Sequence, residues 1–253
     1  PGFLAIVNGA AGGGRCSKRA TEALDALRGK GLFIDVVVTQ HAGHASELAR
    51  EAYERGERHI LAVGGDGTTY EIINGLFPLV LEHPDDPVTL GMLPLGTGNS
   101  FLRDFGIENE TDAIASLTRG RTRSIDVIRV EHAGGILHFI NLLTVGFVTN
   151  AGDLTNRRFK PLGEAGYLLA AMIGVARLRH ERDPMRVDGE LWDDHAASFT
   201  CFGNSQFTGG KFHIAPHADP GDGLVDIVRA RTMNRPRFVK NLIRRYEGRH
   251  VAD

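Results

Sequence analysis

Four short apolar segments in the first third of the chain each run into a loop of glycine or small polar residues. They lie at 3–7, 33–38, 59–63 and 88–93, and helical patterns at 17–29, 45–55 and 69–77 separate them. Short apolar runs that end at such turn residues are typical of buried strands. Because strands and helices alternate, the sequence predicts a parallel sheet with helices on both faces.

The chain changes character after Asp126, where short strand patterns, glycines and turns replace the regular alternation. Strands are expected at 138–145, 185–187, 197–202 and 225–228, and helices at 165–178 and 236–248. The predicted fold class is therefore α/β. A doubly wound parallel-sheet domain at 1–126 is followed by a mostly β second domain at 127–253.

Composition excludes several classes of protein. The formal net charge of −2 gives no overall field that attracts nucleic acid, so no nucleic-acid partner is expected. Cys16 and Cys201 are too few for a disulfide framework and fit a reducing cytoplasm. The apolar stretch at 167–176 is about half of the roughly 20 residues that a membrane span needs. We therefore expect a cytoplasmic protein, for which any membrane association would be peripheral.

The loops after the four strands carry the residues best suited to chemistry. In an open parallel sheet, ligands bind outside the carboxyl ends of the strands. The third strand ends in Gly-Gly-Asp-Gly-Thr at 64–68, directly before a helix whose free N–H groups and dipole favour phosphate. The other ends carry Asn8-Gly9, Thr39 and the string Pro-Leu-Gly-Thr-Gly-Asn at 94–99. Any single loop is explained as well by a tight turn, but together they predict a phosphate-binding edge.

These residues resemble a known family. The string at 64–68 with Glu71 and Asn74-Gly75, and the string at 94–99 with Phe101, are similar to the diacylglycerol kinase catalytic family. That family includes bacterial lipid kinases, sphingosine kinases and ceramide kinases. NAD kinases and phosphofructokinases share the first string, so the resemblance implies a nucleotide domain like theirs. The second string narrows the match to lipid kinases.

The resemblance implies an ATP-dependent kinase that transfers the γ-phosphoryl group to a hydroxyl of diacylglycerol or a similar lipid. The implied cofactors are ATP and Mg²⁺, and the implied partner is a lipid substrate at a membrane surface. A homodimer is compatible with the sequence. The expected helix at 236–248 places arginines beside apolar residues, which fits either an anionic membrane surface or an ordinary docked helix.

Site residues carry over from the family by position. Asp66 and Asp126 would act in catalysis, with Asp66 helping to hold Mg²⁺ against the phosphates. Asp219, Asp222 and the main-chain oxygen of Leu224 would hold a structural Mg²⁺, although the spacing alone also fits an Asp-Gly turn. The residues implied to line the ATP site are Asn8, Gly9, Thr39, Gly64, Gly65, Asp66, Gly67, Thr68, Glu71, Thr97 and Asn99.

One element of the family pattern is not expected within this chain. The family places a catalytic Asp-Gly-Glu, with the Glu as general base, after the last basic helix. In this sequence, residues 249–253 follow that helix and do not contain the string. The string Asp-Gly-Glu at 188–190 lies too early and is expected to be a hairpin tip.

Two other functions remain open from the sequence. A NAD kinase-like phosphotransferase would share Gly-Gly-Asp-Gly-Thr and use an Asn-Glu pair, and Asn109-Glu110 is such a pair in a predicted loop. A non-catalytic nucleotide- or lipid-binding protein would keep the loops without turnover. His41 and His44 are three residues apart but lack the intervening glutamate of a zinc-binding helix, so no metal site is predicted there.

Overall fold

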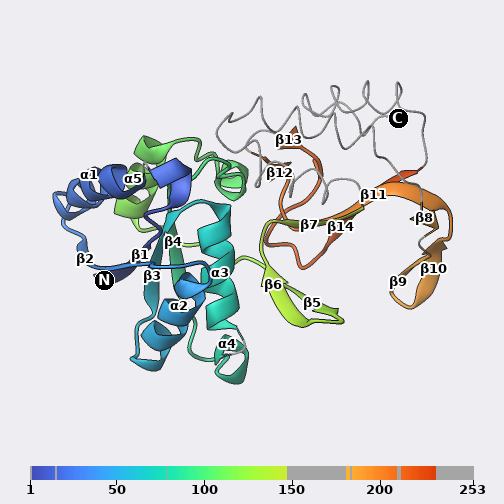
Figure 1. Cartoon of the computed structure of the whole chain (residues 1–253), viewed down its shortest axis with the longest axis horizontal. Helices are drawn as coiled ribbons and strands as arrows, with labels where there is room; N and C mark the ends of the chain where they lie inside the picture. The colour runs from blue at the N-terminus through green and yellow to red at the C-terminus, as the bar shows by residue number, and fades with distance from the viewer. Residues whose placement is uncertain are drawn as a thin grey trace. The chain divides into compact units, whose positions relative to one another are not determined.

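The computed structural model describes residues 2–14, 16–77, 79–146, 181–182, 184–209 and 212–231. The chain divides into two compact units, Pro1–Ile140 and Asn141–Asp253 (Figure 1). Each unit has its own hydrophobic core. The domain boundary expected between residues 126 and 127 stays a prediction. The expected helices at 165–178 and 236–248 lie outside the described residues.

The first unit is built on the parallel sheet that the strand–helix alternation predicts. Its strands are β1 (Gly2–Val7), β2 (Phe33–Val38), β3 (His59–Gly64) and β4 (Thr89–Pro94), in the order β2-β1-β3-β4. Val7 pairs with both Val38 and Val63, and Gly64 pairs with Pro94. The register therefore brings the carboxyl ends of all four strands to one edge of the sheet.

Helices cover both faces of this sheet because successive strand residues point to opposite sides. Ala5 and Val7 pack in one core with α1 and α5, whereas Leu4 and Ile6 pack in another with α2 and α3. Figure 1 shows α1 and α5 together on one side of the strands. The helices of this unit are η1 (Ala11–Gly14), α1 (Cys16–Arg28), α2 (His44–Glu54), α3 (Asp66–Leu76), α4 (Leu79–Glu82), η2 (Phe101–Phe105) and α5 (Glu110–Arg119).

The loop expected around Asn109-Glu110 is instead the start of α5. Asn109 is the N-cap, and its side chain accepts a hydrogen bond of 3.0 Å from the amide of Asp112. Glu110 forms an ion pair of 3.0 Å with Arg19 of α1. Both residues thus have structural partners, because a side-chain oxygen at the N-cap satisfies one of the free N–H groups of the helix.

The prediction of a single strand at 138–145 is wrong, because parts of two strands, β6 (Gly135–Phe139) and β7 (Leu142–Gly146), occupy that region. β5 (Ile128–His132) and β6 form a hairpin of the first unit, and β7 belongs to the second. Between β6 and β7, the carbonyl of Asn141 accepts hydrogen bonds from the amides of Asn204 and Ser205. Because Leu142 pairs with Gly203 of β11 (Ala196–Gly203), these bonds continue the β7–β11 pairing by one residue, so Asn141 joins the second unit while β6 ends in the first.

The second unit is mostly β in its described part. Its strands are β7, β8 (Glu181–Arg182), β9 (Met185–Val187), β10 (Glu190–Asp193), β11 (Ala196–Gly203), β12 (Phe207–Thr208), β13 (Phe212–His213) and β14 (Asp226–Arg231). β11 pairs antiparallel with β14 and β7, and Phe199 and Cys201 of β11 lie in the core. The strands expected at 185–187, 197–202 and 225–228 are confirmed as β9, β11 and β14.

The string Asp188-Gly189-Glu190 is a hairpin tip, as expected. Asp188 and Gly189 have φ values of 50° and 85°, which suit the two-residue turn between β9 and β10. Within the described ranges, no helix is both long enough and apolar enough to cross a bilayer.

Candidate functional site

Main-chain hydrogen bonds join the loops at the carboxyl edge of the sheet into one continuous surface. The first amide after a strand donates to a carbonyl at the end of the neighbouring strand. These bonds run from Thr39 N to Val7 O (2.9 Å), from Asn8 N to Val63 O (2.9 Å), and from Leu95 N and Gly96 N to Gly64 O (2.7 and 2.8 Å). The predicted strand-end residues Asn8, Thr39 and Gly64 are therefore brought together on one edge.

The two glycine loops touch through their backbones at Gly65 and Gly96. A Cβ built on Gly96 would lie 2.5 Å from the Cα of Gly65, and one built on Gly65 would lie 3.1 Å from the Cα of Gly96. Neither position accepts a side chain without a backbone shift. These two glycines are thus required by loop packing.

Gly64 and Asn8 are fixed by Thr68 in the first turn of α3. A Cβ on Gly64 would lie 2.3 Å from the Thr68 hydroxyl, which excludes any side chain there. The same hydroxyl accepts a hydrogen bond of 3.1 Å from the Asn8 side-chain amide. Thr68 therefore links the ends of β1 and β3, and its side chain is turned into the protein and is buried.

Gly67 differs from its neighbours because nothing in the described part of the chain requires a glycine there. It lies in the first turn of α3, outside the left-handed region, and a Cβ built on it would meet no atom within 4 Å. Glycine in a helix is less stable than alanine by about 0.5–1 kcal/mol. An open, side-chain-free helix N-terminus is what an anionic group needs to reach the main-chain amides.

Asp66 lies between the two glycine loops and connects them. Its carboxylate oxygens accept hydrogen bonds from the amides of Ser100 (2.8 Å) and Phe101 (3.5 Å). Burial raises the pKa of the Asp66 carboxyl, and the bonds from Ser100 and Phe101 partly oppose this shift. A nearby cation would stabilise the charged form. The carboxylate is a hard oxygen donor of the kind that Mg²⁺ prefers, so its position fits the implied ion.

Asn99 and Gly9 have local structural roles at this edge. The Asn99 side-chain amide donates to the carbonyl of Gly96 at 2.7 Å, and Asn99 has a positive φ of 48°. Its Oδ1 is buried and has no hydrogen-bond partner among the described residues. A Cβ on Gly9 would lie 2.8 Å from the hydroxyl of Ser17 in α1. Thr97 is exposed at the tip of the loop after β4.

Glu71 faces the start of α2. Its carboxylate accepts a hydrogen bond of 3.2 Å from the amide of Ala45, and its carbonyl accepts one of 2.5 Å from the hydroxyl of Ser46. The structure thus gives Glu71 a role in joining α3 to α2. A role in lining the ATP site stays a prediction.

Asp126 lies in the segment between α5 and β5, which has no regular secondary structure. Its neighbours Ile125 and Val127 pack against the cluster of Ile73 and Phe101. This places the segment beside α3 and η2, the elements that carry Asp66 and its amide donors. The catalytic role of Asp126 stays a prediction.

The predicted metal residues of the second unit form exposed turns between β13 and β14. The carboxylate of Asp219 accepts from the amide of Gly221 (3.0 Å), and that of Asp222 accepts from Leu224 (2.9 Å). Burial and the negative charge of Asp222 raise the pKa of Asp226. A cation would offset this negative charge, so the donors fit Mg²⁺, while the turn bonds account for Asp219 and Asp222 without it.

Sequence reasoning missed Ser100 as a site residue. Its amide holds Asp66, and its residue is buried. A main-chain donor leaves no signature in residue type, so its position directly after Gly-Thr-Gly-Asn was the one available signal. Asn74 was noted in the motif without a role, and it exchanges two hydrogen bonds of 2.8 Å with the backbone of His138, fixing α3 to β6.

Comparison with known proteins extends this description. Residues 2–130 match the family model of the diacylglycerol kinase catalytic domain, and residues 141–253 match that of the YegS C-terminal NAD kinase beta sandwich-like domain. A diacylglycerol kinase of Mycobacterium tuberculosis is 31% identical over 252 residues, which cover 98% of this chain and 79% of the relative. A probable YegS-like lipid kinase of Klebsiella pneumoniae is 32% identical, over 90% of this chain and 73% of the relative. A solved diacylglycerol kinase structure from Bacillus anthracis has a TM-score of 0.72 at 27% identity and covers 98% of this chain and 78% of its own.

Proposed function

We propose that this chain, which belongs to the diacylglycerol kinase catalytic-domain family, transfers the γ-phosphoryl group of ATP to a hydroxyl of diacylglycerol or a similar lipid. The relatives named as diacylglycerol and lipid kinases support kinase chemistry. Their matches extend over nearly the whole chain, so both units take part in the comparison.

The observation that carries the proposal is the open first turn of α3 at Gly67. The amides of this turn lie at the edge where all four strands end, next to the carboxylate of Asp66. The amides of Thr68 and Thr69 donate to the carbonyl of Gly65, so we expect the triphosphate to lie against those of Asp66 and Gly67. The helix dipole and the N–H groups at a helix start both favour an anion.

Phosphoryl transfer depends mainly on positioning and on neutralising charge. In the proposed reaction the amides of α3 orient the phosphates, and Asp66 supplies an oxygen ligand for Mg²⁺. When bound, Mg²⁺ would neutralise negative charge on the phosphoryl oxygens. The amides of Ser100 and Phe101 keep the Asp66 carboxylate in place. Holding the ligand rigidly is what makes such electrostatic stabilisation effective.

The acceptor is tested by incubating the protein with γ-labelled ATP, Mg²⁺ and one acceptor at a time. The acceptors are diacylglycerol in mixed micelles, sphingosine and NAD, with triacylglycerol as the matched control because it has no free hydroxyl. We expect a labelled, solvent-extractable product with a lipid acceptor and none with triacylglycerol.

If NAD is the one acceptor that yields a labelled product, the protein is a NAD kinase-like enzyme and the lipid kinase proposal is wrong. The pair Asn109-Glu110 does not favour that alternative, since both side chains are engaged, one in the α5 cap and the other in the pair with Arg19. Binding of ATP without product from any acceptor would instead indicate a binding protein.

A further inference from the structure

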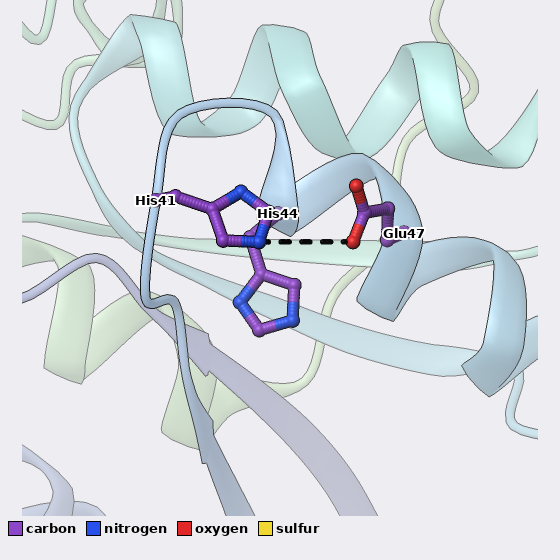
Figure 2. A group of neighbouring side chains, drawn as sticks. All are labelled: His41, His44 and Glu47. Carbon is purple, nitrogen blue, oxygen red and sulfur yellow. Dashed lines mark ion pairs between the residues drawn. The ribbon is translucent and has the colours of Figure 1, made fainter.

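The loop between β2 and α2 brings together three side chains that can ligate a metal: His41, His44 and Glu47 (Figure 2). A ring nitrogen of each histidine and a carboxylate oxygen of Glu47 all lie within 4.8 Å of one another. Gly43, with φ of 83°, lets the chain turn back so that His41 lies over the start of α2. None of these residues belongs to the phosphate-binding edge proposed above.

The hydrogen bonds of His41 leave one nitrogen facing the carboxylate. Its Nδ1 lies 3.1 Å from the carbonyl of Ala42, to which it can donate, and its Nε2 lies 4.0 Å from Oε2 of Glu47. A metal-binding histidine usually donates its second N–H to a carbonyl or carboxylate in this way. The arrangement therefore presents a lone pair on Nε2 to any ion held by Glu47.

His44 completes the group but has to change its contacts. Its ring stacks on that of His41, with 4.6 Å between centroids and 21° between planes, and its Nδ1 accepts from the amide of Gln40 at 2.9 Å. An ion lies in the plane of each imidazole that binds it, so the stacked rings must rotate apart. The His41 side chain is 56% exposed and has room to do so.

We infer that His41, His44 and Glu47 form a binding site for a divalent transition metal, with Zn²⁺ as the best match. Two imidazoles and one carboxylate are a common three-ligand set for Zn²⁺, with water in the fourth position. Mg²⁺ prefers oxygen donors, so this site differs in chemistry from the nucleotide site. His44 and Glu47 both lie in the first turn of α2, and the Glu47 carboxylate offsets the positive end of the helix dipole.

The test is a calorimetric titration of the chelator-treated full chain with Zn²⁺, without nucleotide. His132 provides the control, because it is an exposed histidine, as His41 is, and lies outside this group; like His44, it accepts a main-chain N–H at Nδ1, from Gly134 at 3.1 Å. We expect His41→Ala to lose one Zn²⁺ per chain or to weaken its binding by roughly 10- to 100-fold, since even second-shell losses have that size. Glu47→Gln should weaken it in the same direction, and His132→Ala should leave it unchanged.

Co²⁺ gives a second measurement, because its visible absorption reports low-coordinate nitrogen and oxygen ligation. We expect an absorption band in the wild-type chain that His41→Ala removes. Both His41 and Glu47 are exposed, so their substitution should not unfold the protein. Equal Zn²⁺ binding by wild type and His41→Ala, or an equal loss in His132→Ala, would overturn the inference.

Discussion

Replacing Gly67 by alanine should make the protein more stable and its nucleotide binding weaker. A methyl group at this position meets no atom within 4 Å, and the backbone lies outside the left-handed region. A compatible Gly→Ala change stabilises a protein by about 0.4–1 kcal/mol. For a chain of this size, that corresponds to a rise in Tm of roughly 1–4 °C.

The expected effect of Gly67→Ala on ATP affinity has the opposite sign to its effect on stability. The added methyl would stand beside the amides of Asp66 and Gly67 at the start of α3 and keep the phosphates from reaching them. A hydrogen bond to a charged group contributes about 1.5–3 kcal/mol, so the loss of one such bond weakens binding by roughly 10- to 150-fold. The opposite signs separate a ligand contact from ordinary damage to the fold.

Differential scanning fluorimetry measures the stability, and calorimetric titration with a non-hydrolysable ATP analogue and Mg²⁺ measures the affinity. Gly96→Ala serves as the steric control, because its methyl would lie 2.5 Å from the Cα of Gly65. It should destabilise the protein by about 1–3 kcal/mol through overpacking. If Gly67→Ala gains stability and binds the analogue as tightly as wild type, the phosphates do not lie at the start of α3.

Three further changes test other contacts. Asp66→Asn replaces the carboxylate, which accepts hydrogen bonds from main-chain amides, by a side-chain amide whose N–H cannot accept them. The loss of the charged ligand should lower the kinase rate by roughly 100-fold or more, while the circular dichroism spectrum stays native. Asn109→Ala removes the N-cap of α5 and should cost about 1 kcal/mol in urea unfolding. Burial and, to a smaller extent, the positive charge of Arg129 lower the pKa of His138 in the folded protein. Below about pH 6.5 the unfolded chain therefore binds more protons than the folded one. The unfolding free energy should thus fall between pH 7.5 and pH 5.5, and less steeply in His138→Gln.

The parallel sheet was predictable because each strand and helix carries its own local pattern. The start of α5 also has a local signal, Asn109 three residues before Asp112, which fits an N-cap better than the loop that the Asn109-Glu110 pair suggests. The break between β6 and β7 had none, since β6 pairs with the adjacent β5 whereas β7 pairs with β11, which lies far along the chain. Pattern reasoning identifies elements that local residues determine and misses boundaries that distant partners determine.

The same distinction applies to the predicted site. Asn8, Thr39 and Gly64 were expected at one edge because strand ends of a parallel sheet must converge, and the hydrogen bonds there confirm that they do. The carboxylate of Glu71 accepts a hydrogen bond from the amide of Ala45, and the position of Glu71 in the motif does not predict this contact. His44 and Glu47 are neighbours through their helical spacing in α2, whereas His41 joins them only because the chain turns at Gly43, which helical spacing does not predict.

The string Gly-Gly-Asp-Gly-Thr looks uniform as a motif, yet its three glycines exist for different reasons. Gly64 is required by the Thr68 hydroxyl, and Gly65 by the backbone of Gly96. Both would be glycine in a protein with this loop packing and no ligand at all. Gly67 has no such reason within the described chain, and glycine there is less stable than alanine would be. A glycine at this position is explained if a bound group occupies the space beside it. Within this string, the functional inference therefore depends mainly on Gly67 and on the carboxylate of Asp66 next to it.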